Sequence, residues 1–155
     1  MTQYDGWDLP EPYVHRITVG EDAIDAFGHA NNARYLEWAD QAAWTHWVDA
    51  GYRMEDCAED DRGIAIMRTE ADYLGHVRLC DELDCAVWIT KSDGRLRAER
   101  RYQFRKASDG STVFRAVTTL VCFQLSTGRP ARMSQALKSH YQVKPCVAEA
   151  LLTEN

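Results

Sequence analysis

The stretch from Asp25 to Asp40, DAFGHANNARYLEWAD, changes character in its middle. Its first half gathers an acid, a glycine, a histidine and two asparagines within eight residues, a composition typical of turns. Its second half follows the three- and four-residue spacing of a helix with one apolar face. Polar side chains crowded where a helix begins predict either a helix cap or a catalytic site.

Apolar side chains recur at helical spacing from about Asn32 onward and predict one long helix. They are Tyr35, Leu36, Ala39, Ala42, Ala43, Trp47 and Ala50. Asn31 or Asn32 is a suitable N-cap because a short side-chain oxygen can accept a hydrogen bond from a first-turn N–H. Gly51 can take the positive φ that often follows a helix. The predicted helix has about 18 residues and a length of roughly 27 Å.

Strand-like segments with alternating and β-branched residues lie on both sides of this helix. They are residues 13–19, 63–76, 82–90, 95–107 and 112–125. The tripeptide Ser-Asp-Gly occurs at 92–94 and again at 108–110, and Asp-Gly between alternating runs favours a hairpin. The last three strands are therefore predicted to form an antiparallel meander. The tail MSQALKSHY, residues 133–141, predicts a short helix.

One long helix and about five strands must bury each other's apolar faces. The economical solution is an α+β fold in which an antiparallel sheet wraps around one central helix, the hotdog architecture. We expect a single domain over residues 1–155, with its core at about 13–133. Because such a sheet leaves an edge strand and apolar surface, a homodimer or homotetramer is expected.

The composition limits the classes of function. The chain of 155 residues is 45% hydrophobic and 27% charged, with a net charge of −6, which argues against general nucleic-acid binding. No apolar run approaches the roughly 18 residues that span a bilayer, and the first residues resemble no leader peptide. The five cysteines are irregularly spaced and form no CxxC pair. We therefore expect a cytoplasmic protein without a metal site that binds neither nucleic acid nor membrane.

The polar turn can be interpreted chemically. The first turn of a helix has unpaired N–H groups and a partial positive charge, so it can hold a developing oxyanion. A carboxylate upstream, such as Asp25, can attack a carbonyl held there or activate a water. Gly28 lets the backbone approach a ligand closely. The implied chemistry is acyl transfer or hydrolysis, although the same residue types also serve as ordinary caps and turn formers.

The stretch 25–40 resembles the signature of the 4-hydroxybenzoyl-CoA thioesterase-like branch of the hotdog acyl-CoA thioesterases. That signature has an aspartate three residues before a glycine, then a helical tyrosine and often a tryptophan. The matching residues are Asp25, Gly28, Tyr35 and Trp38, and the HxNN variant is present as His29, Asn31 and Asn32. The segments EADYLGHVRLCDELDCAVWI and TTLVCFQLSTGRPARMS continue the resemblance, which covers about residues 13–133.

Two positions depart from the family's pattern. Cys80 stands where the family's GDEL segment has glycine, and His76 stands where a proline is usual. His76 is thereby expected near the ligand-binding edge, where it can alter substrate preference.

The resemblance implies a role for each matching residue. Asp25 is the catalytic carboxylate, acting as nucleophile or as general base, and Asp22 is a competing acid. The backbone N–H of Asn32 polarises the thioester carbonyl. The residues expected to line the site or orient water are Gly28, His29, Asn31, Tyr35 and His76. No cofactor is implied.

Arginines are suited to the phosphates of coenzyme A, and two groups of them stand out. Arg129 and Arg132 lie in the TGRPAR turn and are candidate contacts to the acyl-CoA substrate. A second group shares one face of the strand predicted at 95–107 and consists of Arg95, Arg97, Arg101 and Arg105.

Hydrolysis of an aliphatic or aromatic acyl-CoA is the function that these features favour. A hotdog hydratase or dehydratase is the first alternative, but its DxNxxH pattern places histidine five residues after the acid. Here His29 follows Asp25 by four residues, and Phe27 occupies the asparagine position. A non-catalytic acyl-CoA-binding module is the second alternative, and the presence of Asp25 argues against it.

Overall fold

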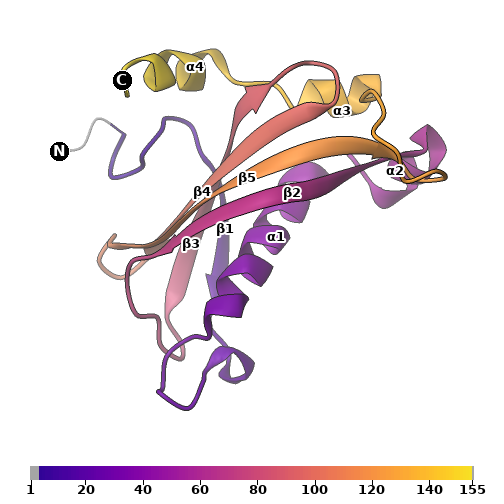
Figure 1. Ribbon diagram of the computed structural model, residues 1–155. Helices are drawn as coiled ribbons and strands as arrows, with labels where there is room; N and C mark the ends of the chain where they lie inside the picture. Colours follow the sequence, from indigo (N-terminus) through magenta and orange to yellow (C-terminus); the bar gives the residue numbers. More distant parts are fainter. Residues whose placement is uncertain (1–3, 155) are drawn as a thin grey trace.

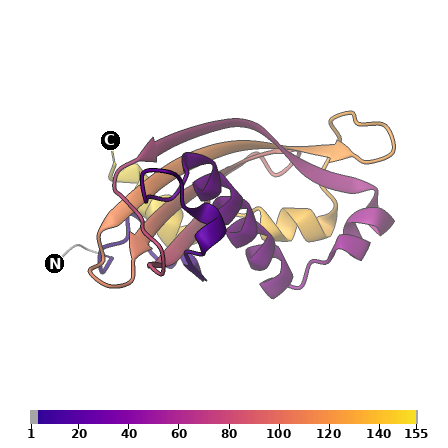
Figure 2. The same cartoon turned by 90° about the horizontal axis from the view of Figure 1, so that it is seen from below.

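The structure of the protein is a computed structural model that describes residues 4–154 (Figure 1). The elements in chain order are β1 (Tyr13–Thr18), the 3-10 helix η1 (Glu21–Ala23), α1 (Asn32–Asp49), α2 (Met54–Asp60), β2 (Arg62–Tyr73), β3 (Glu82–Ser92), β4 (Arg97–Lys106), β5 (Thr112–Gln124), α3 (Gln135–His140) and α4 (Pro145–Leu152). The strands form one antiparallel sheet in the order β1-β3-β4-β5-β2. Figure 2 shows this sheet arching over α1, which confirms the predicted α+β arrangement.

Helix α1 has the predicted length of 18 residues. Asn31 is the N-cap, and Gly51 follows the helix with a φ of +88°. Leu36 and Ala50 were expected on the buried face, and this expectation is wrong because both are exposed. Leu36 belongs instead to a stripe of residues four apart that continues with Asp40 and Trp44. Asp40 and Trp44 line a cavity that β2 also lines.

The buried faces of helix and sheet meet in two apolar clusters on the concave side of the sheet. The larger cluster includes Tyr35, Trp38, Ala42, Val87, Phe104 and Phe114. The second lies around the C-terminal half of α1 and includes Trp47, Tyr52, Leu120, Leu137 and Tyr141. Most contacts of α1 with the sheet are with β1 and β3, so the helix covers the β5 and β2 side less closely.

The convex face of the sheet is covered by the N-terminal segment and by α4. Leu9, Trp88 and Val147 are buried there, and Trp88 donates a hydrogen bond from Nε1 to the carbonyl oxygen of Pro10 (2.9 Å). The predicted meander of β3, β4 and β5 and the short helix α3 in the tail are confirmed, whereas α2 and α4 were not predicted. Across residues 4–154, no helix is both long enough and apolar enough to cross a membrane.

Candidate active site

The loop before α1 holds one oxygen of the Asp25 carboxylate. Its Oδ1 accepts hydrogen bonds from the backbone N–H groups of Phe27 (2.8 Å) and His29 (3.4 Å). The Asp25 N–H donates to the carbonyl of His29 (2.9 Å), and Gly28 completes the turn with a φ of +78°. A side chain at position 28 would meet open space, so the backbone angle alone calls for glycine there. Among the described residues Oδ2 accepts no hydrogen bond, so this oxygen is free to act on a ligand.

The start of α1 leaves one backbone donor unpaired. The Asn31 side-chain oxygen accepts from the Ala33 N–H (2.9 Å), and the Asn31 carbonyl accepts from the Arg34 N–H (2.9 Å). The Asn32 N–H, at the first position of the helix, has no acceptor within residues 4–154. It therefore points outward at the positive end of an 18-residue helix, where an oxyanion is stabilised.

His76 reaches the same loop from the segment between β2 and β3. The His29 and His76 rings stack with centroids 4.2 Å apart and an interplanar angle of 20°. The Ala30 N–H donates to the carbonyl of Val77 (2.8 Å), which ties the two loops together. The structure thus brings His76 beside His29, next to Asp25 in the same turn.

Tyr35, near the start of α1, belongs to the core cluster that packs beneath this loop. Its side chain is buried and packs against the rings of Tyr73 and Phe114, with centroids 5.4 and 5.3 Å away. Burial, together with the nearby Tyr73 and Asp81, raises the pKa of Tyr35 to about 12. A phenol that stays protonated at neutral pH suits packing better than proton transfer.

Asp22, the competing carboxylate, has a different environment. It is exposed, and its Oδ2 lies 3.7 Å from Nη1 of Arg34. Arg34 also donates to the Asp22 carbonyl (3.0 Å) and to Glu37 (2.7 Å). Asp25 has no such ion pair among the described residues, so the geometry favours Asp25 over Asp22.

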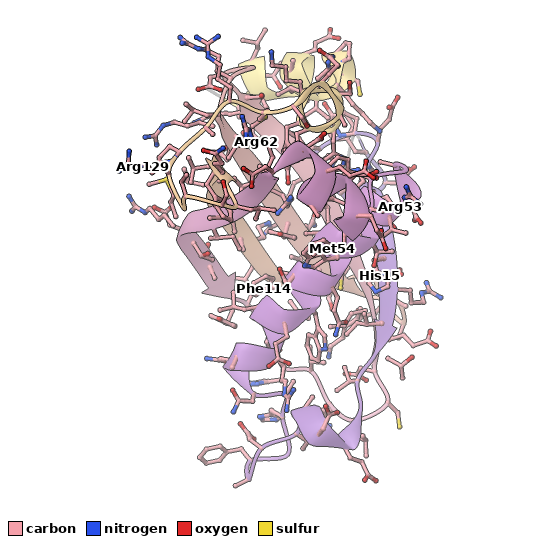
Figure 3. The ribbon with its side chains drawn as sticks, turned by 90° about the vertical axis from the view of Figure 1, so that its right-hand side faces the viewer. His15, Arg53, Met54, Arg62, Phe114 and Arg129 are labelled. Atoms are coloured by element: carbon pink, nitrogen blue, oxygen red, sulfur yellow. The ribbon has the colours of Figure 1, made fainter. Side chains whose placement is uncertain are left out.

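Arg129 and Arg132 lie far from the Asp25 loop within the same chain. Both are exposed in the turn between β5 and α3. Figure 3 shows Arg129 and Arg62 together at the end of the molecule opposite to the loop that precedes α1. One chain alone therefore does not bring these arginines to the proposed catalytic residues.

Two arginines of the predicted basic stripe, Arg101 and Arg105, make contacts within the chain. Arg101 pairs with Glu154 (3.0 Å), and Arg105 stacks over the Trp7 ring with its Cζ 4.6 Å from the centroid. Sequence reasoning missed the arginine on the other face of the same strand, Arg100, which is only 5% exposed. Its signal was its position in the inward-facing series of this strand, between Ala98 and Tyr102.

Comparison with known proteins identifies one family. The family described as the thioesterase-like superfamily matches residues 19–141, a range that includes the Asp25 loop, α1 and every strand of the sheet except β1. Among curated proteins, none matches this chain.

Solved structures with the same fold are numerous and of low sequence identity. A 1,4-dihydroxy-2-naphthoyl-CoA thioesterase from Synechocystis has a TM-score of 0.77 at 17% identity and covers 84% of this chain and 96% of that chain. A Staphylococcus aureus protein in complex with CoA has a TM-score of 0.78 at 16% identity and covers 87% of each chain. The probable thioesterase YbaW from Escherichia coli has a TM-score of 0.73 at 22% identity and covers 85% of this chain and 99% of that chain. These similarities establish the hotdog fold.

Proposed function

The chain belongs to the thioesterase-like superfamily, and from this premise we propose that it hydrolyses the thioester bond of an acyl-CoA. The products are the free acid, aliphatic or aromatic, and coenzyme A. The observation that carries this proposal is the pairing of Asp25 with the start of α1. One carboxylate oxygen is fixed by two backbone N–H groups, the other is free, and the unpaired Asn32 N–H belongs to the same loop–helix junction.

The proposed reaction uses this pair as base and oxyanion donor. The thioester carbonyl oxygen accepts a hydrogen bond from the Asn32 N–H, which stabilises the negative charge that develops there. Oδ2 of Asp25 takes a proton from a water as the water oxygen attacks the carbonyl carbon. The C–S bond then breaks, and the departing thiolate takes the proton from Oδ2 of Asp25, which gives the free thiol and restores the carboxylate.

The same groups also serve a covalent route. Oδ2 of Asp25 attacks the carbonyl, the thiolate leaves, and water opens the resulting anhydride. In both routes His29, His76 and Asn31 line the entrance to the loop, and Tyr35 forms its apolar floor. The relatives support the substrate class, since one is described as a thioesterase of an aromatic acyl-CoA and another as a complex with CoA.

We also propose that two copies of the chain pair through β2, as a homodimer or as the unit of a homotetramer. β2 is a 12-residue edge strand, and its Ile66 and Met67 side chains are 50% and 57% exposed. A long edge strand with exposed apolar side chains is a template for pairing with another strand. A single-protomer mass in analytical ultracentrifugation would contradict this assembly.

Such pairing explains the distance between Arg129 and Asp25 within one chain. In an antiparallel β2–β2 pair, the Arg62 end of one strand lies beside the Tyr73 end of the other. The turn with Arg129 in the second copy then approaches the Asp25 loop of the first copy. Guanidinium groups in that position suit the phosphates of coenzyme A.

The experiment that tests the proposed function measures thiol release from a panel of short, long and aromatic acyl-CoA esters. It compares the wild-type protein with the Asp25→Asn variant. An asparagine oxygen can keep the hydrogen bonds from Phe27 and His29 while the basic charge is lost. We expect release to fall by about 100-fold or more with little change in melting temperature. Asp22→Asn is the matched control and should keep most of the activity.

Other outcomes point to the other candidates. Full activity in Asp25→Asn would remove this residue from the mechanism. If the wild-type protein released no thiol from any ester but bound the esters, a binding module would be the better description. Water addition to an enoyl-CoA would instead identify a hydratase.

A further inference from the structure

A cavity of about 470 Å³ lies beside the C-terminal half of α1, a volume within the usual range of small-molecule pockets. Its apolar walls come from α1, α2, β2 and β5 and include Trp44, Trp47, Met54, Ile66 and Phe123. The cavity exists because α1 packs mainly on β1 and β3 and leaves space along β2 and β5. Figure 3 places Met54 where α2 begins, on the same side of the molecule as α1.

The cavity is lined by a buried cation. Arg100 projects from the inner face of β4 and is only 5% exposed. Its Nη2 donates to the Tyr141 hydroxyl (2.8 Å) and its Nη1 to the Tyr102 hydroxyl (3.3 Å), but its Nε has no partner. Among residues 4–154 no carboxylate lies within 4.0 Å of this guanidinium.

The other charged and titratable groups nearby do not neutralise Arg100. His46 and His140 lie close to it, and burial lowers their pKa values to about 4 and about 3, so both are neutral at pH 7. Asp40, the carboxylate of the cavity lining, is on the exposed stripe of α1 and forms no ion pair with Arg100. Hydroxyl groups, those of Tyr102 and Tyr141, are the hydrogen-bond acceptors of this cation.

Burying a cation without a counter-ion is costly, and an anion bound beside it recovers part of that cost. We propose that this cavity binds an organic acid with an apolar body, whose carboxylate pairs with Arg100 and whose body packs on the tryptophans. A carboxylate accepts from guanidinium N–H groups, and each Nη of Arg100 carries a second N–H besides the one that it donates to a tyrosine. The aromatic walls suit a ring or a medium-length chain.

Two sources supply the same chemistry. One is a free acid, such as the product of hydrolysis. The other is the far end of an acyl group that carries a second carboxylate and whose thioester lies at the Asp25 loop of the paired copy, and this source rests on the proposed function and the proposed β2 pairing. The cavity starts at Asp40, eight residues into α1, or about 12 Å along the helix from Asn32. It is therefore separate from the Asp25 loop of the same chain.

The test is isothermal titration of the wild-type protein at pH 7 with 2-naphthoate and decanoate, against their uncharged amides of equal shape. We expect the acids to bind at least tenfold more tightly than the amides. Arg100→Met should abolish this preference, and Arg100→Lys should retain part of it. Arg101→Gln, on the opposite face of β4, is the matched control and should behave as wild type.

Each result bears on the proposal. Equal binding of acid and amide, or no binding of either, overturns it, and this comparison needs no variant in case Arg100→Met fails to fold. Acid binding by Arg100→Met with wild-type affinity also overturns it. Because binding is measured without turnover, an inactive protein that prefers acids would contradict the proposed hydrolysis and not this site.

A kinetic comparison separates the two sources. Adipoyl-CoA and hexanoyl-CoA have acyl chains of the same length, but only adipoyl ends in a carboxylate. If the acyl group supplies the anion, Arg100→Met should raise KM for adipoyl-CoA at least tenfold and leave KM for hexanoyl-CoA unchanged. If both KM values stay unchanged while Arg100→Met loses the preference for free acid, the free acid is the source.

Discussion

The two ends of α1 are built in opposite ways. At the N-terminal end, the polar groups are mostly backbone atoms and the short side chains of Asp25 and Asn31, and they are largely accessible to water. At the C-terminal end, aromatic rings and one guanidinium are buried against the sheet and α3. One helix thus carries an exposed hydrogen-bond donor at its start and an enclosed apolar cavity near its end. The proposed catalytic groups and the start of the proposed acid-binding cavity are separated by about 12 Å along the helix.

The largest effect on stability is expected at the C-terminal end, from Tyr141→Phe. The Tyr141 hydroxyl accepts from Trp47 Nε1 (2.8 Å) and from Arg100 Nη2 (2.8 Å), so its loss leaves two buried donors unpaired. We expect the free energy of unfolding to fall by ~3 kcal/mol in urea titrations. Tyr102→Phe removes only the longer bond of 3.3 Å and should cost clearly less. Similar losses of stability in both variants would contradict the assignment of this stabilisation to the Tyr141 hydroxyl.

The next effect is a dependence of stability on pH that also arises at this end. Burial holds His46 and His140 uncharged in the folded state, with pKa values of about 4 and about 3, below the value of about 6.5 in the unfolded chain. Between these values the unfolded state binds more protons, so stability is complete above pH 6.5 and falls as the pH decreases towards 4. We expect a loss of ~2 kcal/mol between pH 7 and pH 5, since both rings keep some contact with water.

Urea titrations at several pH values measure this slope. The double variant His46→Gln with His140→Gln should show a nearly flat profile between pH 7 and pH 5. If the slope of unfolding free energy against pH is unchanged in the double variant, groups other than these two histidines take up the protons. The carboxylates with lowered pKa values, such as Asp61 and Asp93, titrate below this range.

The smallest effect is expected at the N-terminal end, from Asn31→Ala. Its side-chain oxygen caps α1 by accepting from the Ala33 N–H (2.9 Å), and loss of such a cap costs ~1 kcal/mol. Thermal melting should reveal this decrease. Asn32→Ala is the matched control, because the Asn32 side chain is exposed and forms no hydrogen bond within the described residues. Equal destabilisation by both changes would contradict the assignment of the cap.

Local sequence patterns predicted most of the fold. Alternation and the two Ser-Asp-Gly turns located the strands, and helical spacing located α1 to within a residue. The helices α2 and α4 have only seven and eight residues, too few for a clear periodic pattern. The start of α4 did carry a signal, because Pro145 occupies its first turn.

The candidate site also has a part that local sequence predicts and a part that depends on contacts between distant segments. Residues 25–32 are contiguous, so their local hydrogen bonds follow from the turn and the helix start. The stacking of His76 on His29 depends on contact between two loops, which the sequence indicates only through resemblance. Arg100 lies at an inward position of β4. Because arginines usually face water, sequence reasoning does not predict its burial until the elements that cover this strand are known.

The unpaired N–H of Asn32 has a consequence for how this protein tolerates change. A backbone donor is supplied by any residue except proline, so position 32 constrains the side chain hardly at all. Position 31 favours short capping residues, position 28 favours residues that accept a φ of +78°, and the proposed function would restrict position 25 to an acid. The proposed oxyanion donor therefore imposes almost no restriction on the residue type at position 32. The restrictions fall on the neighbouring positions 25, 28 and 31.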